Sequence, residues 1–593
     1  MAKLPQPDPR YLQALRMLEE AVAAQRGGRA AEADQLFGRV LKKNPDYFDA
    51  LNLYGVFKYQ HNKPHDALKL LTRATALNPR SVGALNNLGV VHGALARPKD
   101  ALAAFDRALA LDAANPQTLG NRGNALAALG RLDEALASYD RARAAEPNRP
   151  DIHHNRGNVL YRLGRHDEAL ASYDKALALN PRAPDVLMSR GALLQEQARY
   201  AEALPCYDKA VALAPQFAEA HRTRGCVLLG LERPAEALTS IDAALALNPN
   251  QALALTNRGS VLQELNRAEE ALASHQAALR LEPKHQQARY NAAIAELSLG
   301  RYADGWRDYE SRWGNPDLAS IRRTFPQPLW LGDTPVAGKT ILLHAEQGFG
   351  DAIQFVRYAP LVTALGATVL LQAPQPLCEL FRSVAGVTCV LSRDEALPAF
   401  DLHCPLLSLP FALRANVPSI PAGVPYLAPP AERIAAWRAR LAAAPRRIGL
   451  AWSGRLYPKN RSVPFGALRA LLALPDTAFV SLQQELPDED QRQLADAPNV
   501  QHFGKALADF TDTAALIANL NLVVSIDSAV AHLAGALGKP LCLLLLFASD
   551  FRWLIDRADS PWYPTARLFR QRRAGDWAEA IEDVRQTIAA QPQ

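Results

Sequence analysis

Residues 116–149, PQTLGNRGNALAALGRLDEALASYDRARAAEPNR, decide the fold of the first half of this chain. They contain two helical patterns, with Gly130 at the end of the first and Pro147 at the end of the second. Small residues at Gly123 and Ala135 would let the two helices approach closely. We therefore expect this unit to form one pair of packed helices.

The same marks recur with a 34-residue period in three columns. The glycine column is Gly55, Gly89, Gly123, Gly157, Gly191, Gly225 and Gly259. The alanine column is Ala67, Ala101, Ala135, Ala169, Ala203, Ala237 and Ala271. The proline column is Pro45, Pro79, Pro147, Pro181, Pro215, Pro249 and Pro283, with Ala113 in the one remaining place. This period is typical of tetratricopeptide repeats, so we predict an all-α superhelix of about nine units over residues 1–315, the first and last degenerate.

A polar column lies two residues before each glycine. Its members are Asn87, Asn121, Asn155, Ser189, Thr223, Asn257 and Asn291. An amide side chain can donate to a peptide C=O and accept from a peptide N–H, so the five asparagines are candidates for holding an extended protein acceptor. The same column could instead be structural. Beside it runs an arginine column that favours an acidic or carbonyl-rich partner or is paired locally: Arg122, Arg156, Arg190, Arg224 and Arg258.

Composition narrows the function classes. The net charge of +6 is small for 593 residues, and no basic tract carries interleaved aromatics, so we expect no nucleic-acid partner. Six cysteines without CxxC spacing indicate reduced thiols in a cytoplasmic protein without a zinc site. The start of the chain has no apolar signal-like run, and the most apolar stretch, 541–547, is too short to span a bilayer. We therefore expect a cytoplasmic protein without membrane insertion.

From Pro335 onward, short β-type runs alternate with helical patterns. The first set of expected strands is 339–347, 367–373, 387–392 and 400–404. Prolines then crowd between residues 418 and 430, and a second alternating set follows. This pattern predicts an α/β module of two Rossmann-like lobes with a cleft between them. The expected boundaries are a linker at 316–335, an N-terminal lobe at 336–428 and a C-terminal lobe at 429–593.

The turn Gly348-Phe349-Gly350-Asp351 lies where a strand passes into a helix. Glycines there let a ligand approach the backbone, and a helix N-terminus favours an anion. The turn is not the dinucleotide fingerprint, because Ile353 stands where a third glycine would be. Asp351 is either a cap of this helix or a general base in the cleft.

Two further constellations belong to the second lobe. Trp452-Ser453-Gly454 precedes a loop with Lys459, Arg461 and Ser462, whose cations either neutralise a phosphate or are simply solvated. Asp527 and Ser528 close a buried strand and open a helix, a second N-terminus suited to an anion. His532, one turn further, could donate to a phosphate or only pack. We find no metal-ligand pattern near these residues and no P-loop, and we predict no metal and no bound cofactor.

These segments resemble the ADP-heptose-type glycosyltransferases of family 9. The matching residues are Gly350-Asp351, Arg461-Ser462-Val463-Pro464 and the run from Asp527 to Pro540. The resemblance implies a GT-B fold, Asp351 as the general base and Arg461 in place of a phosphate-binding lysine. It implies that Arg461, Ser528, Ala529 and His532 bind the donor. Together with the turns and the loop described above, the predicted donor-binding residues are Gly348, Gly350, Lys459, Arg461, Ser462, Asp527, Ser528, Ala529 and His532. The first lobe is shorter than in the lipopolysaccharide heptosyltransferases, so the repeats stand where their acceptor-binding region would be.

Repeats followed by such a module also resemble the nucleocytoplasmic O-GlcNAc transferases, whose asparagine ladder holds protein substrates. HAEQGFGDAIQF (344–355) and SPWYPTARLFRQ (560–571) are similar to the bacterial flagellin glycosyltransferases. This likeness implies a cytoplasmic, metal-independent protein O-glycosyltransferase acting on flagellin. Its donor would be a CMP-activated nonulosonic acid such as CMP-pseudaminic acid, whereas the family 9 motifs favour ADP-heptose. The alternatives are a lipopolysaccharide-type sugar transferase and a non-enzymatic scaffold with a degenerate transferase fold.

Overall fold

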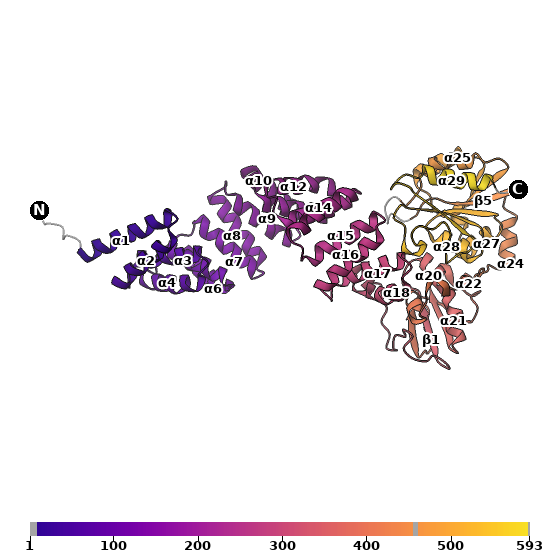
Figure 1. The fold of residues 1–593 in the computed structure, drawn as a ribbon, viewed down its shortest axis with the longest axis horizontal. Helices are drawn as coiled ribbons and strands as arrows, with labels where there is room; N and C mark the ends of the chain where they lie inside the picture. Colours follow the sequence, from indigo (N-terminus) through magenta and orange to yellow (C-terminus); the bar gives the residue numbers. More distant parts are fainter. Residues whose placement is uncertain (1–8, 455–460, 591–593) are drawn as a thin grey trace. The chain divides into compact units, whose positions relative to one another are not determined.

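The computed structural model describes residues 9–454 and 461–590 (Figure 1). The chain divides into two compact units, Met1–Leu231 and Glu232–Gln593. Helices α1 to α18 form the repeats, and parallel sheets with covering helices follow them in the second unit. The predicted fold class, an all-α repeat array followed by an α/β region, is confirmed.

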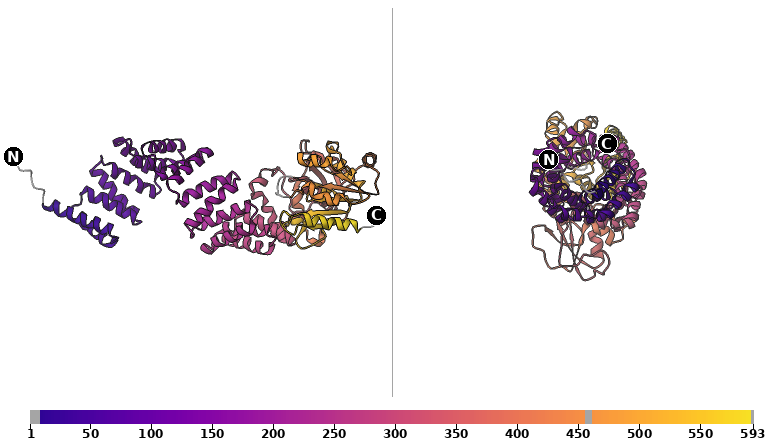
Figure 2. Two further views of the ribbon diagram at one scale, coloured as in Figure 1. Left: turned by 90° about the horizontal axis from the view of Figure 1, so that it is seen from above. Right: turned by 90° about the vertical axis from the view of Figure 1, so that its left-hand side faces the viewer.

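The first unit consists of helix pairs that follow one another in the order of the sequence (Figure 2). The helices are α1 Pro9–Arg26, α2 Ala30–Lys43, α3 Phe48–Gln60, α4 Pro64–Leu77, α5 Val82–Ala94, α6 Pro98–Leu111, α7 Pro116–Ala128, α8 Leu132–Ala145, α9 Pro150–Arg162, α10 His166–Leu179, α11 Pro184–Glu196, α12 Tyr200–Leu213 and α13 Ala218–Gly230. Helices α1 to α12 form six successive pairs, as the 34-residue period predicts, and α13 is the first helix of a further repeat.

The glycine column is explained by contact between the two helices of a repeat. A Cβ built on Gly123 would lie 2.7 Å from the ring of Tyr139, and one on Gly157 would lie 2.5 Å from Tyr173. Any larger residue would therefore displace the buried ring of the partner helix. Gly130 ends α7 with a φ of +76°, a conformation that favours glycine.

The arginine column is paired within the array. Arg122 on α7 donates from Nε to Asp106 on α6 (2.6 Å) and from Nη1 to Ser138 on α8 (2.7 Å). Arg156 repeats the pattern one unit later with Asp140 and Ser172. Both of these arginines therefore join the second helix of one repeat to both helices of the next, and Arg190, Arg224 and Arg258 likewise pair with Asp174, Asp208 and Asp242. Of the two expectations for this column, local pairing is the one that the structure shows.

The second unit opens with the last repeat helices. These are α14 Pro234–Leu247, α15 Ala252–Glu264, α16 Ala268–Leu281, α17 Gln286–Ser298 and α18 Tyr302–Tyr309, followed by the 3-10 helix η1 Glu310–Gly314 and the short α19 Pro316–Ala319. Helix α18 belongs to the core of the lobes: the Trp306 ring centroid is 5.7 Å from that of Phe355 in the first lobe and 5.8 Å from that of Phe551 in the second. The last repeat helix is thus packed into the α/β part.

The first sheet has the order β3-β2-β1-β4, and its strands are all parallel. The strands are β1 Thr340–His344, β2 Thr368–Ala373, β3 Val387–Ser392 and β4 Leu402–Pro405, close to the four expected runs. The helical segments of this lobe are α20 Phe349–Phe355, η2 Val356–Tyr358, α21 Ala359–Ala364, α22 Gln375–Phe381, η3 Leu406–Ser408, α23 Leu409–Ala412 and η4 Val417–Ser419. The order reverses between β1 and β4, and ligands of such sheets bind outside the carboxyl ends at this switch point.

The second sheet is also parallel, in the order β10-β9-β8-β5-β6-β7. The strands are β5 Arg446–Ala451, β6 Thr477–Ser481, β7 Val500–His502, β8 Leu522–Ile526, β9 Leu541–Leu545 and β10 Ala566–Arg570. The helical segments are α24 Ala431–Arg438, η5 Phe465–Leu468, α25 Arg469–Leu472, α26 Asp488–Ala495, η6 Gly504–Ala506, α27 Phe510–Ala518, α28 Ala529–Ala536, η7 Phe551–Trp553 and α29 Ala578–Ala589. Counted from β5, this is the doubly wound order 3-2-1-4-5-6, and its switch point lies between β5 and β8. The loops after these two strands hold the residues singled out in the sequence.

Candidate functional site

A cavity of about 1070 Å³ in the second unit brings the three constellations together. Its lining includes the turn 348–351 after β1 and the residues Ser453, Gly454 and Arg461 after β5. The residues 527–530 after β8 line it as well. Repeat helices α15 and α17 and the loop after α15 also contribute to the lining, through Gln263, Asn266, Tyr290 and Ser298. One cavity therefore joins the strand ends of both lobes to the end of the repeat array.

Asp351 lies in the first turn of α20, with its side chain 21% exposed. Its Oδ2 accepts a hydrogen bond from the backbone N–H of Gly348 at 2.8 Å, so it caps its own helix. Its Oδ1 forms an ion pair with Nη2 of Arg552. Asp351 therefore caps the helix and also lines the cavity. Its role as a general base stays a prediction.

Gly350 is a point of close approach between the two lobes. A Cβ at this position would lie 2.8 Å from Cδ2 of His532 and 3.4 Å from Cα of Ala529. Figure 1 shows α20 of the first lobe beside α28 of the second. We expected Gly350 to let a ligand approach the backbone. In the structure it also allows α20 and α28 to pack closely.

The N-terminus of α28 faces the cavity through Ser528, Ala529 and Val530. Ser528 is the N-cap residue in an extended conformation, but its side chain does not cap the helix; its Oγ lies 3.1 Å from that of Ser525. The first N–H groups of a helix have no acceptor within the helix and carry its positive dipole end. This edge of the cavity is therefore suited to a phosphate or another anion.

Arg461 lines the cavity beside Gly454, where a Cβ would lie 3.1 Å from its Nη2. Its buried Nε has no hydrogen-bond partner among the described residues. Ser462 contacts the end of the segment after β5, because its Oγ accepts from the N–H of Gly454 at 3.1 Å. Lys459, the other predicted cation, lies outside the described residues. Arg461 thus adds positive charge to the edge that holds the α28 N-terminus.

His532 is buried behind this edge. Its Nδ1 lies 2.9 Å from the hydroxyl of Tyr563, its ring stacks on Trp553 at 5.3 Å, and its Nε2 is 3.7 Å from Oδ1 of Asp527. Burial, with nearby arginines, lowers the pKa of His532 well below its usual value, so the ring is neutral at pH 7. Burial and the neighbouring Asp550 raise the pKa of Asp527 to about 6.

Sequence reasoning missed Arg552, which joins the lobes at the cavity. Its guanidinium pairs with Asp351 and donates from Nε to Oε1 of Gln354 (2.9 Å), both in the first lobe. It also pairs with Asp550 of its own lobe at 2.7 Å. The sequence feature that could have indicated Arg552 is a cation soon after the apolar strand β9, because residues that follow such a strand lie at the carboxyl edge of the sheet.

The ladder asparagines lie outside the lining of this cavity. Asn87, Asn121 and Asn155 in the first unit donate to side chains of the preceding repeat, namely Asn52, Asn86 and Asn124. In the second unit, Asn291 donates to Ser260 at 3.0 Å, and Asn257 is half-exposed on α15. The amide nitrogens of Asn87, Asn121, Asn155 and Asn291 thus link adjacent repeats, and the ladder's part in acceptor binding stays a prediction.

Within residues 9–454 and 461–590, no three histidine, cysteine, aspartate or glutamate side chains gather closely enough to hold a metal ion. All six cysteines are free. None of the helices in the described part of the chain has the length and apolar character that crossing a membrane requires.

Comparison with known families places two matches on this chain. The tetratricopeptide repeat model matches residues 58–117, 121–184, 188–252, 222–275 and 256–313. The model of glycosyltransferase family 9 (heptosyltransferase) matches residues 489–550. This second range contains Asp527, Ser528, Ala529 and His532, but neither Asp351 nor Arg461.

Individual proteins are similar to parts of the chain. The protein FlbA of Caulobacter vibrioides is 29% identical over 325 residues, which cover 50% of this chain and 54% of FlbA, so the chain spans about half the length of this curated relative. The crystal structure of YrrB, described as a TPR protein with an unusual peptide-binding site, is 27% identical, covers 31% of this chain and 95% of YrrB, and has a TM-score of 0.29. The structure of PilF of Pseudomonas aeruginosa is 25% identical, covers 35% of this chain and 94% of PilF, and has a TM-score of 0.32.

These matches confirm the resemblance drawn from the sequence. The chain combines tetratricopeptide repeats with a part similar to family 9 heptosyltransferases, and together with the likeness to FlbA this supports a glycosyltransferase that carries repeats.

Proposed function

We propose that this protein is an O-glycosyltransferase that moves a sugar from a nucleotide-sugar to a serine or threonine hydroxyl of a protein held by the repeats. The family 9 match supports the transferase activity, and the repeats support a protein partner. The two parallel sheets with a shared cavity support a GT-B module.

The observation that carries this proposal is the shared cavity. Its lining includes the anion-favouring N-terminus of α28 and Arg461, and it also includes residues of the last repeats. A donor phosphate bound by α28 and Arg461 and an acceptor arriving along the repeats would therefore meet in one space. A scaffold without catalytic function would not need these two surfaces to face one cavity.

In the proposed reaction, the acceptor hydroxyl oxygen bonds to the anomeric carbon of the sugar, and the bond from that carbon to the leaving phosphate breaks. The hydroxyl proton passes to the carboxylate of Asp351. The leaving phosphate is stabilised by the N–H groups of α28 and by Arg461. Because these groups supply the positive charge that a departing phosphate needs, we propose a metal-independent reaction.

The proposed acceptor is flagellin, on the resemblance to flagellin glycosyltransferases described above. The proposed donor is a CMP-activated nonulosonic acid such as CMP-pseudaminic acid, or ADP-heptose. The free cysteines fit the cytoplasm, where thiols stay reduced, and we propose that the reaction takes place there.

The decisive test is intact-mass analysis of flagellin and other filament proteins from cells with and without this gene. A discrete mass missing from flagellin in the deletion strain is the expected result, and its size identifies the sugar. Flagellin of unchanged mass would refute this acceptor.

A lipopolysaccharide-type sugar transferase is the second candidate, favoured by the heptosyltransferase match. Lipopolysaccharide isolated from the same two strains distinguishes it. A shortened glycan in the deletion strain, with flagellin unchanged, would favour this candidate over a protein acceptor.

A further inference from the structure

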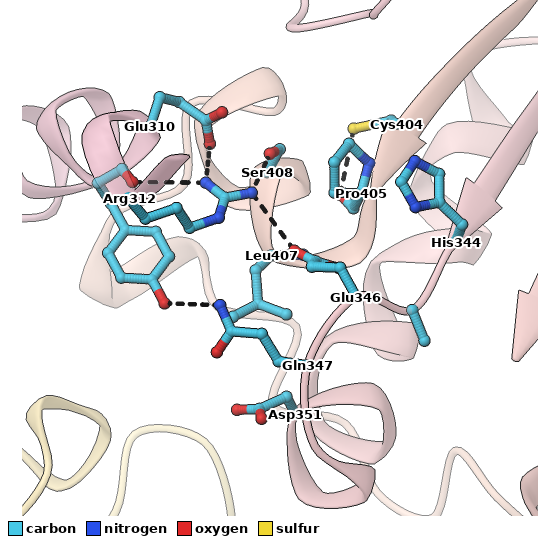
Figure 3. Close-up of polar contacts among 12 residues, drawn as sticks. Glu310, Arg312, His344, Glu346, Gln347, Asp351, Cys404, Pro405, Leu407 and Ser408 are labelled. Atoms are coloured by element: carbon cyan, nitrogen blue, oxygen red, sulfur yellow. Dashed lines mark hydrogen bonds and ion pairs between the residues drawn. The ribbon is translucent and has the colours of Figure 1, made fainter. Parts of the chain in front are cut away.

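A buried guanidinium ties the end of the repeats to the first lobe. Arg312, in η1 directly after the last repeat helix, has a side chain with 0% exposure. Its Nη1 binds Oε1 of Glu310 at 2.6 Å, and its Nη2 donates to Oγ of Ser408 at 2.7 Å and pairs with Oε1 of Glu346 at 3.3 Å (Figure 3). Three elements far apart in the sequence therefore meet at one side chain.

Glu346 is the acidic partner from the lobe and is equally buried. It lies between the end of β1 and the turn 348–351, and its Oε1 also accepts from the N–H of Leu407 after β4 at 3.3 Å. These are the two loops at the switch point of the first sheet. Glu346 therefore lies where the chain leaves the sheet to form the turn with Asp351.

The next residue is held by the repeats as well. Gln347 donates from Nε2 to the hydroxyl of Tyr309, the last residue of α18, at 3.3 Å. Two consecutive residues before Gly348 thus contact two residues at the end of the repeat array. Figure 3 shows Glu346 and Gln347 on the same segment as Asp351, with Arg312 on the side of the repeats.

The network is poorly suited to a purely stabilising role. Nε of Arg312 and Oε2 of Glu346 have no hydrogen-bond partner among the described residues. Burial raises the pKa of Glu346 to about 7, although Arg312 opposes that rise. A buried ion pair with unsatisfied atoms is weak support for stability, but its geometry is highly directional.

We propose that Arg312 and Tyr309 are positioning residues that fix the turn carrying Gly348, Gly350 and Asp351. The end of the repeat array is then part of the catalytic unit and not only an arm for the acceptor. This inference rests on the proposed function for its catalytic consequence, but the positioning itself is a property of the folded chain.

Hydrogen–deuterium exchange of the full-length chain tests the positioning without any substrate. In Arg312→Met, amides of the segment 345–355 should exchange about tenfold faster or more, because the turn loses its anchor. Exchange in β2 and β3 of the same lobe should stay within about twofold. The control is Val584→Ala, which opens the core under α29, away from the cavity, and should leave 345–355 unchanged. Unchanged or lobe-wide faster exchange in Arg312→Met would overturn the proposal.

If Arg312→Met fails to fold, Tyr309→Phe still decides the question, because it removes only the hydroxyl that Gln347 contacts. Exchange in 345–355 should again rise selectively, and an unchanged segment would overturn the role of Tyr309. Arg312→Lys keeps the charge but not the planar fork that reaches Glu310, Glu346 and Ser408 together, and should give an intermediate exchange rate.

Kinetics then separate positioning from the proposed function. With the wild-type donor and acceptor, kcat of Arg312→Met should fall about tenfold or more while KM for the nucleotide-sugar stays within about twofold. A raised KM with unchanged kcat would contradict positioning of Asp351. If the wild-type protein transfers no sugar at all, the proposed function fails, and the exchange experiment alone decides this inference.

Discussion

Gly350 of the first lobe lies against His532 of the second, so closely that a Cβ on Gly350 would be 2.8 Å from Cδ2 of the histidine. This contact sets the N-terminus of α20, with Asp351, beside the N-terminus of α28. The arrangement of α20 and α28 at the cavity therefore requires glycine at position 350, because a side chain there would clash with His532.

Gly350→Ala should destabilise the second unit by about 1–3 kcal/mol, because the new methyl group forces α20 and α28 apart. Thermal unfolding should show a lower melting temperature. The control is Gly38→Ala on α2, where nothing lies within 4 Å and the helix should gain stability. A Gly350→Ala protein that melts like the wild type would mean that the interface relaxes freely.

Asp351→Asn tests the proposed base. Sugar transfer should fall by about 10²–10⁴-fold, because an amide cannot take up the hydroxyl proton. The fold should persist, since the amide oxygen of the substituted side chain can still accept from the N–H of Gly348. The matched control is Asp401→Asn in the same lobe, an exposed carboxylate that accepts from the N–H of Thr340. Transfer retained by Asp351→Asn would exclude its role as base.

Arg461→Met should weaken donor binding about tenfold or more, because a charge-assisted contact to the phosphate is lost. Calorimetric titration with the nucleotide-sugar measures this change. Arg469→Met, at the exposed first residue of α25, removes the same charge elsewhere in the lobe and should bind the donor normally. Equal affinity in both variants would remove Arg461 from the donor site.

His275 should make the second unit acid-sensitive. It is fully buried, neither ring nitrogen has a hydrogen-bond partner among the described residues, and burial lowers its pKa to about 4. Between pH 6.5 and 4, His275 takes up a proton in the unfolded chain but stays neutral in the folded chain. Acidification therefore lowers the free energy of unfolding by up to about 3 kcal/mol. His275→Phe should remove this loss, because Phe105 fills the same repeat position.

Unfolding free energies of both proteins at about pH 7 and about pH 4.5 check this assignment. The advantage of His275→Phe should grow toward low pH, and a constant difference would show that His275 is not held neutral. Phe105→His is the reciprocal variant and should introduce acid sensitivity into the first unit.

Ladder variants separate acceptor binding from chemistry. Asn121→Ala with Asn155→Ala should weaken binding of the protein acceptor while donor hydrolysis continues, because neither residue lines the cavity. Pull-down of flagellin and nucleotide release from the donor measure the two properties. Loss of both together would make the ladder structural, consistent with its bonds between repeats.

The sequence by itself determined the elements whose cause is local. The 34-residue period specified the helix pairs, and the glycine column anticipated the close approach of the two helices at Gly123, because both helices lie within one repeat. The turn with Asp351 and the start of α28 at Ser528 were also predictable, since a buried strand followed by a cap is a short-range pattern. The positions of these residues at one cavity follow from two doubly wound sheets.

Only the tertiary structure decided how these pieces act on one another. Arg552 pairs with Asp351 across 201 residues of sequence, and no periodicity encodes such a contact. The burial of Trp306 among the lobes and the pairing of Arg312 with Glu346 likewise join segments that the sequence assigned to separate domains. Charge pairs and core contacts of this kind depend on which faces of distant elements meet, and that is fixed by packing of the whole unit.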